Sequence, residues 1–177
     1  MKIYVIRHGE TDWNVEKRAQ GQTDIELNEN GIKQALEAKQ LVQNLGIDFI
    51  ISSPLKRAAK TAEIVSDGKY EIIYDARLKE RCFGDIEGKR LKDINFEEIY
   101  NVDLNLSTYN IEPINDLFNR LNNFLTDIKT KYSNKTILLV AHGGVLRTLT
   151  ACIEGVPKTR TLASQGYKNC EIREFNI

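Results

Sequence analysis

The sequence has few of the features that mark secreted and membrane proteins. Its three cysteines are an odd number and lie far apart, so they form neither a disulfide framework nor a Cys-x-x-Cys metal motif. No apolar run is long enough to cross a membrane, and the run near the start is too short for the core of a signal peptide. We therefore expect a cytoplasmic protein with reduced thiols.

An excess of one charge is also missing. The chain has 25 Lys and Arg and 25 Asp and Glu, for a formal net charge of +0. Nucleic-acid-binding proteins are typically basic, and a neutral chain has no general attraction to anionic membranes, so we expect neither partner. Hydrophobic residues make up 41% of the 177 residues and charged residues 28%, a balance typical of one globular domain.

Short β-branched runs alternate with stretches of helical periodicity, which is typical of an α/β fold. Strands are expected at residues 3–6, 49–51, 71–74, 136–141 and 170–175, and helices at 31–45, 56–65, 114–128 and 145–153. The helix at 31–45 is expected to have one apolar face, formed by Ile32, Ala35, Leu36, the stem of Lys39, Val42 and Leu45. The order of elements predicts a three-layer α/β/α sandwich with a mostly parallel central sheet.

Residues 89–113 depart from this alternation. The segment is polar, rich in Asn and without a strong period. It is either a short lid insertion over a site or an ordinary surface loop. We expect one domain over residues 1–177, with this insertion within it.

The chain contains only two histidines, and their settings match. His8 and His142 each follow an apolar strand and precede a glycine. Because ligands bind at the carboxyl ends of strands in open α/β sheets, both side chains could face one crevice. Two alternatives remain at this point: a pair of buried histidines bonded to carbonyl groups, and a zinc site, for which two histidines are a thin ligand set.

Charged residues follow the same strand ends. Arg7 adjoins His8, and Arg57 comes shortly after the second predicted strand. Guanidinium groups match phosphate oxygens in a bidentate way, which indicates a phosphoryl pocket. Arg57 alone would more simply form a surface ion pair. Glu80, after the third predicted strand, could act as an acid and base for a leaving oxygen.

These residues together resemble a family. The run Arg7–Asn14 is similar to the signature of the histidine phosphatase superfamily, the phosphoglycerate-mutase-like proteins. The resemblance continues at residues 18–35, 52–62, 78–88 and 141–144, in the family's order and over nearly the whole chain.

The resemblance implies a mechanism and a set of site residues. His8 matches the nucleophile, which attacks a phosphate monoester and forms a phosphohistidine. Glu80 matches the proton donor to the leaving oxygen. The positions that hold the phosphate oxygens are matched by Arg7, Arg57 and His142. Further substrate contacts at matching positions are Asn14, Gln20, Gly21 and Gly143. The resemblance implies no metal and no organic cofactor.

Two kinds of enzyme fit this resemblance. A mutase must hold an intermediate with two phosphates and exclude water, which requires extra cations and a closing lid. The run Arg81–Gly88 is more similar to the phosphatase branch, and the insertion is short and carries Glu97, Glu98, Asp103 and Glu112. We therefore expect a phosphatase acting on small-metabolite phosphate monoesters, with a phosphoglycerate mutase as the alternative. A silent phosphate-binding regulator is a third candidate.

The leaving group is less well defined by the sequence. The candidate substrates of the phosphatase are α-ribazole phosphate and sugar phosphates. Side chains that could line an apolar leaving-group pocket are Phe83, Ile94, Phe96, Ile99, Tyr100 and Tyr109. The same residues could instead pack the insertion onto the body. Thr11 and Trp13 are expected to serve local turn bonding and packing, and Glu10 to form a structural bond.

Overall fold

A five-stranded sheet forms the centre of the computed structural model, which describes residues 1–177. The strands are β1 (Lys2–Arg7), β2 (Phe49–Ser52), β3 (Ile72–Tyr74), β4 (Thr136–Ala141) and β5 (Ile172–Asn176). Their order in the sheet is β3-β2-β4-β1-β5. All neighbours are parallel except β5, which runs antiparallel to β1. The predicted mostly parallel sheet is confirmed.

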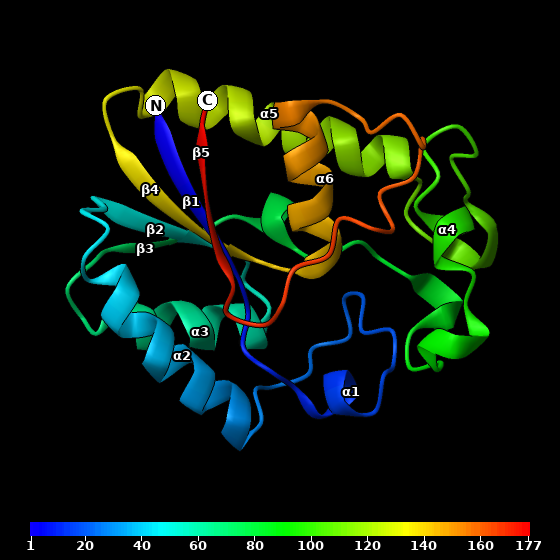
Figure 1. Cartoon of the computed structure of the whole chain (residues 1–177), viewed down its shortest axis with the longest axis horizontal. Helices are drawn as coiled ribbons and strands as arrows, with labels where there is room; N and C mark the ends of the chain where they lie inside the picture. Colours follow the sequence, from blue (N-terminus) through cyan, green and yellow to red (C-terminus); the bar gives the residue numbers. More distant parts are fainter.

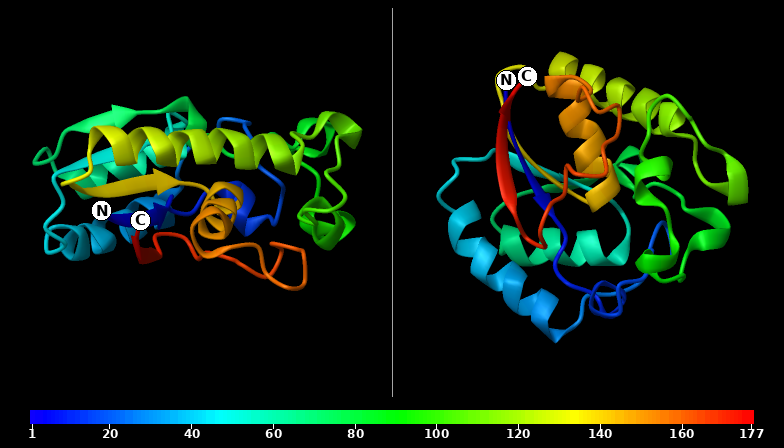
Figure 2. Two further views of the ribbon diagram at one scale, coloured as in Figure 1. Left: turned by 90° about the horizontal axis from the view of Figure 1, so that it is seen from above. Right: turned by 45° about the vertical axis from the view of Figure 1, so that its right-hand side comes forward.

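Helices cover both faces of this sheet. They are α1 (Asp12–Val15), α2 (Glu29–Val42), α3 (Lys56–Ser66), α4 (Phe96–Ile99), α5 (Ile114–Lys131) and α6 (Gly143–Glu154). Short 3-10 turns lie at Ala76–Leu78, Gly84–Ile86, Leu91–Asp93 and Thr108–Asn110. Helices α2 and α3 pack on one face and α5 and α6 on the other, as Figures 1 and 2 show. This is the predicted three-layer sandwich. None of the helices has both the length and the apolar character needed to span a membrane.

The alternation of side chains along the strands divides the core in two. On β1, Ile3 and Val5 join the cluster beneath α5 and α6, whereas Tyr4 and Ile6 join the cluster above α2 and α3. Successive strand residues point to opposite faces, so a strand buried on both sides is apolar throughout. The widest apolar stripe is that of α5, with buried Ile114, Leu117, Leu121, Phe124, Leu125 and Ile128.

Helix α2 differs from its prediction in position and in its buried face. It begins two residues early because the Asn28 side chain accepts a hydrogen bond from the Gly31 amide and caps the helix. Ile32 and Leu36 are 39% and 47% exposed, so their predicted burial was wrong, whereas the predicted burial of Ala35 and Val42 is confirmed. The buried side carries Gly31 and Ala38 beside Ala35 and Val42. These residues are mostly small and allow close packing, and a Cβ on Gly31 would collide with the Glu10 carbonyl.

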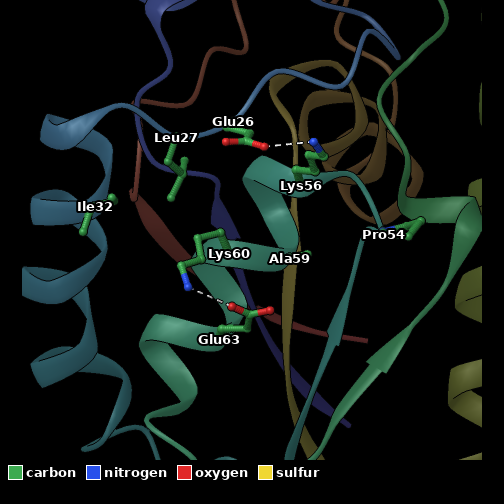
Figure 3. A pocket seen from close by; sticks show the side chains of 8 residues that line it. All are labelled: Glu26, Leu27, Ile32, Pro54, Lys56, Ala59, Lys60 and Glu63. Atoms are coloured by element: carbon green, nitrogen blue, oxygen red, sulfur yellow. Dashed lines mark hydrogen bonds and ion pairs between the residues drawn. The ribbon is translucent and has the colours of Figure 1, made fainter.

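The exposed Ile32 lines a surface hollow of about 440 Å³ between α2 and α3 (Figure 3). Two ion pairs lie at this hollow, Lys56–Glu26 at 2.9 Å and Lys60–Glu63 at 3.1 Å. None of the predicted site residues lines it.

The insertion at residues 89–113 lies beside one end of the sandwich and contains α4 (Figure 1). Its backbone is held by the loop before β5, because Leu162 donates to the Tyr100 carbonyl at 3.0 Å and Val102 donates to Arg160 at 2.9 Å. The insertion therefore has a fixed attachment on the side of α6, close to the carboxyl edge of the sheet.

Candidate active site

The two histidines meet at the carboxyl edge of the sheet, as predicted. Strands β1 and β4 are parallel neighbours, and the His8 amide extends their ladder by donating to the Ala141 carbonyl at 3.0 Å. The centroids of the His8 and His142 rings lie 5.2 Å apart. The parallel neighbour β2 brings Ser53 to the same edge.

A cavity of about 200 Å³ opens beside His8. Of the residues predicted for the site, it is lined by Arg7, His8, Asn14, Gln20, Gly21, Arg57, Glu80 and Gly143. Its other lining residues are Arg18, Ala19, Phe83, Leu91, Phe96, Tyr100, Gly144 and Arg147. Three of these, Leu91, Phe96 and Tyr100, belong to the insertion, which therefore forms part of the cavity wall.

His8 has the protonation state of a nucleophile. Its Nδ1 lies 2.7 Å from the Gly9 carbonyl oxygen. Because a carbonyl only accepts, Nδ1 carries the proton and Nε2 keeps its lone pair. Burial, and then the nearby cations Arg57 and Arg7, hold the pKa of His8 well below its usual value. The imidazole is thus neutral near pH 7.

The two predicted arginines lie beside His8, Arg57 fully buried and Arg7 half-buried. Arg7 Nη1 donates to the Tyr167 carbonyl at 2.6 Å, while its buried Nε has no partner in the chain. Arg57 donates through Nη1 and Nη2 to the carbonyls of Thr23 and Gly21, at 2.9 and 2.7 Å. Burial lowers the pKa of Arg57 to about 10, which leaves it charged at neutral pH. Arg57 is therefore not the surface ion pair considered from the sequence.

His142 is placed differently from what the resemblance implied. It is fully buried and does not line the cavity. Its Nδ1 accepts from Arg57 Nε at 3.2 Å, and its Nε2 lies 2.8 Å from Ser53 Oγ. Because both ring nitrogens are occupied by protein partners, His142 orients the Arg57 guanidinium in this structure and contacts no open space where a phosphate could bind.

Asn14 presents a donor to the cavity. Its Oδ1 accepts from the Thr11 amide at 3.1 Å and from Asn169 Nδ2 at 3.3 Å. The acceptor end of the amide is therefore held by the protein, and the Nδ2 end is left to donate. Thr11 also caps α1, which confirms its predicted turn bonding. The sequence did not single out Asn169, which in addition donates to the His8 carbonyl at 2.9 Å.

Gln20 and Gly21 form the wall opposite the strand ends. Gln20 Oε1 is buried without a partner, so the amide is available to a ligand. Gly21 has φ +54°, and a Cβ there would collide with the Glu87 carboxylate. Glu87 accepts from the Thr23 and Phe83 amides at 2.9 and 3.0 Å and so joins two loops of the site. Glu87 lies in the run Arg81–Gly88, but its sequence position alone did not single it out.

Glu80 lies at the start of α6. Its Oε2 accepts from the Gly144 amide at 2.9 Å, and its Oε1 accepts from Val145 at 3.1 Å and from Arg81 at 2.8 Å. A carboxylate at a helix N-terminus meets free N–H groups and the positive end of the helix dipole. Arg120 on α5 donates to the Glu80 carbonyl at 3.3 Å and so holds the backbone of the segment that carries Glu80.

Glu10 has the structural role that the sequence analysis expected. Its Oε1 accepts from the side-chain amides of Asn28 and Asn30, both at 3.1 Å. It does not line the cavity. Glu10 thus connects the turn after His8 to the start of α2.

The predicted apolar pocket is divided between two places. Phe83, Phe96 and Tyr100 line the cavity and pack together with ring centroids 6.0 to 6.4 Å apart. The other candidates, Ile94, Ile99 and Tyr109, line a separate hollow of about 450 Å³ within the insertion.

The charges around the cavity also differ from expectation. None of the insertion's acidic residues Glu97, Glu98, Asp103 and Glu112 lines it, whereas Arg18 and Arg147 do. The cavity is more cationic than the composition of the insertion predicted.

The alternative of a zinc site has no ligand set in this structure. No three His, Cys, Asp or Glu side chains gather in a way that could hold a metal ion. The two histidines are instead engaged with a carbonyl, an arginine and a serine.

The two buried histidines make the stability of the fold sensitive to acid. Burial holds the pKa of each below the usual 6.5, so below that pH the unfolded chain binds more protons. The free energy of unfolding should fall by up to about 1.4 kcal/mol per pH unit per histidine as pH drops from about 6.5 to 5.5. Urea unfolding at several pH values measures this slope. A constant free energy of unfolding over that window would contradict the neutral state of both rings.

Comparisons with known proteins agree with this geometry. The model of the histidine phosphatase superfamily (branch 1) matches residues 3–177. The Bacillus subtilis (strain 168) protein named uncharacterized phosphatase PhoE is 38% identical over 154 residues, which cover 86% of this chain and 77% of that protein. The Arabidopsis thaliana phosphoglycerate mutase-like protein 4 is 37% identical over 84% of this chain and 69% of its own.

A solved structure is similar over nearly the whole chain. The mycobacterial glucosyl-3-phosphoglycerate phosphatase superposes with a TM-score of 0.86 at 27% identity, covering 98% of this chain and 91% of that one. With the family model matching almost every residue, the chain belongs to the histidine phosphatase superfamily, branch 1.

Proposed function

We propose that the protein is a phosphatase that hydrolyses small-metabolite phosphate monoesters through a phosphohistidine on His8. One observation supports this above all others. The neutral His8 imidazole keeps its Nε2 lone pair in a cavity whose walls carry the cations Arg7 and Arg57, half-buried and fully buried respectively. A phosphoryl group in transit carries its charge on its equatorial oxygens, so such a pocket favours its transfer.

Each side chain then has a defined part in the two steps. In the first, His8 Nε2 forms a bond to phosphorus while the ester P–O bond breaks, and Glu80 gives a proton to the leaving oxygen. In the second, water attacks phosphorus, the P–N bond breaks, and Glu80 takes a proton from the water. Arg7, Arg57 and the Asn14 amide hold the phosphoryl oxygens. His142 supports Arg57 through the hydrogen bond between them.

The phosphatase proposal is supported by the relatives as well as by the pocket. Proteins named as phosphatases resemble this chain over most of its length. A structure named as a putative α-ribazole-5′-P phosphatase, from Escherichia coli K-12, has a TM-score of 0.84 at 28% identity over 100% of this chain and 91% of its own. The aromatic wall of Phe83, Phe96 and Tyr100 suits the aromatic base of α-ribazole phosphate, which is one substrate class we propose. Sugar phosphates are the other proposed class, supported by the relatives that are named as phosphatases. The three free cysteines fit a reducing compartment, and we propose the cytoplasm.

A phosphoglycerate mutase is the second candidate, and one feature of the cavity favours it. Arg147 and Arg18, which is paired with Glu16 at 2.5 Å, add two guanidinium groups to the walls beyond the pair beside His8. A cavity with four arginines could hold an intermediate with two phosphates. The shortness of the insertion at residues 89–113 favours the phosphatase, because a mutase must exclude water from the phosphohistidine.

A substrate panel distinguishes these candidates. Phosphate release is measured with excess chelator over α-ribazole phosphate, sugar phosphates and 3-phosphoglycerate, and 2-phosphoglycerate is assayed in parallel. The proposal predicts phosphate release that the chelator does not change. Conversion of 3- to 2-phosphoglycerate with little free phosphate would identify a mutase. Binding of phosphate without hydrolysis of any ester would identify a silent regulator, and loss of activity with chelator would contradict metal-free catalysis.

A further inference from the structure

The proposed mechanism gives no part to a hydroxyl group that lines the cavity. Tyr100 carries the only hydroxyl group that lines it. The residue follows α4 in the insertion, and its side chain is 2% exposed. Burial raises the pKa of the Tyr100 hydroxyl to about 12, so the group keeps its proton over the whole physiological range.

The hydroxyl lies beside the carboxylate that would protonate the leaving group. A Cβ on Gly144 would be 2.5 Å from the Tyr100 hydroxyl and 2.5 Å from Glu80 Oε1. Only a glycine at this position leaves room for both groups at the start of α6. Glu80 takes its hydrogen bonds from the amides of Arg81, Gly144 and Val145, and none from Tyr100. The phenol proton is therefore not used by its neighbour.

The ring that carries this hydroxyl is held firmly. The Arg147 guanidinium lies 4.5 Å from the ring centroid and that of Arg81 lies 5.3 Å away. Phe83 and Phe96 pack against the same ring. The backbone is fixed as well, because the Tyr100 carbonyl accepts from Leu162. A donor held in this way loses little entropy when it meets a ligand atom, which is the condition for stabilising a transition state.

We propose that the Tyr100 hydroxyl is a second catalytic group, which donates a hydrogen bond to the leaving-group oxygen as the P–O bond breaks. The inference rests on the proposed phosphatase function. In this step the Glu80 proton moves to the leaving oxygen, the electron pair of the P–O bond stays on that oxygen, and Tyr100 keeps its own proton. The hydroxyl stabilises the charge that develops before the proton from Glu80 has arrived.

The test is the Tyr100→Phe variant, which removes the hydroxyl and keeps the ring between its arginines. Its kcat/KM for an alkyl phosphate such as glycerol 3-phosphate should fall by about 10- to 100-fold. Its kcat/KM for p-nitrophenyl phosphate should change by less than about threefold, because a stable leaving anion needs little help. The matched control is Tyr109→Phe, which removes a hydroxyl from a 62% exposed tyrosine of the same insertion and should change neither value.

A double-mutant cycle separates direct contact from an effect through Glu80. If the hydroxyl contacts the leaving oxygen, Tyr100→Phe should still lower kcat/KM for the alkyl ester in a Glu80→Gln background. No further loss in that background would overturn the proposal, because Tyr100 would then act only by positioning Glu80. Equal losses on both esters together with a lower melting temperature would also overturn it, as a packing role. If the wild type hydrolyses no ester, it is the phosphatase function that fails.

Discussion

Replacing His8 with alanine is expected to lower turnover by at least about 10⁴-fold on every phosphate ester, because no other side chain can take over as the nucleophile. The only other histidine, His142, has its two ring nitrogens engaged by Arg57 and Ser53. Activity of the purified variant, compared with the wild type on the same esters, measures the loss.

The His8→Ala variant should still bind phosphate, and this serves as its control. Arg7, Arg57 and Asn14 are unchanged, so inorganic phosphate should still raise the melting temperature. Appreciable turnover in a correctly folded variant would rule out His8 as the nucleophile. Loss of phosphate binding together with loss of turnover would mean that the substitution had damaged the pocket.

The second large effect is expected from Glu80→Gln, and it should depend on the leaving group. On alkyl phosphates, kcat/KM should fall by about 10²- to 10⁴-fold, because the leaving alkoxide then receives no proton. On p-nitrophenyl phosphate the loss should be less than about tenfold. The comparison uses kcat/KM because this quantity reports the steps up to the formation of the phosphohistidine, whereas kcat also includes the attack of water, in which Glu80 takes part for every ester.

Equal losses of kcat/KM on the two classes of ester would argue against Glu80 as the proton donor. The melting temperature of the variant must be measured as well. The amides of Gly144 and Val145 donate to the Glu80 carboxylate, and an amide group fits these donors less well. A variant that keeps its melting temperature and loses activity only on alkyl esters is the result that we expect.

The fold could be predicted largely because its strands are buried on both faces. Such strands are continuous apolar runs, and β4 has the predicted bounds, Thr136–Ala141. The side chains of α2 were harder to place. Its buried face uses Gly31 and two alanines, which carry little hydrophobic signal, so the larger Ile32 and Leu36 were wrongly predicted to be inside. Close approach of backbones selects small residues, and periodicity of large apolar residues does not detect that constraint.

The sequence identified site residues that lie at a strand end. It missed residues that contact the site from segments distant in the sequence. Arg7 ends β1 and His8 follows it, and their position is visible in the sequence. Asn169 and Arg120 contact the site from remote segments, and single polar residues on a loop or an amphipathic helix carry no local signal. The orientation of His142 also depends on partners, since its nitrogens meet Arg57 and Ser53 only after folding.

Detecting the phosphohistidine itself would test the proposed mechanism directly. Wild-type protein is mixed with a p-nitrophenyl phosphate substrate, quenched within one turnover under alkaline conditions that preserve phosphohistidine, digested and analysed by mass spectrometry. A phosphohistidine mechanism predicts one phosphoryl group per chain, on His8, that disappears as inorganic phosphate is released and is absent from His8→Ala. Rapid phosphate release from the wild type with no phosphorylated His8 at any quench time, or with the label on another residue, would contradict it.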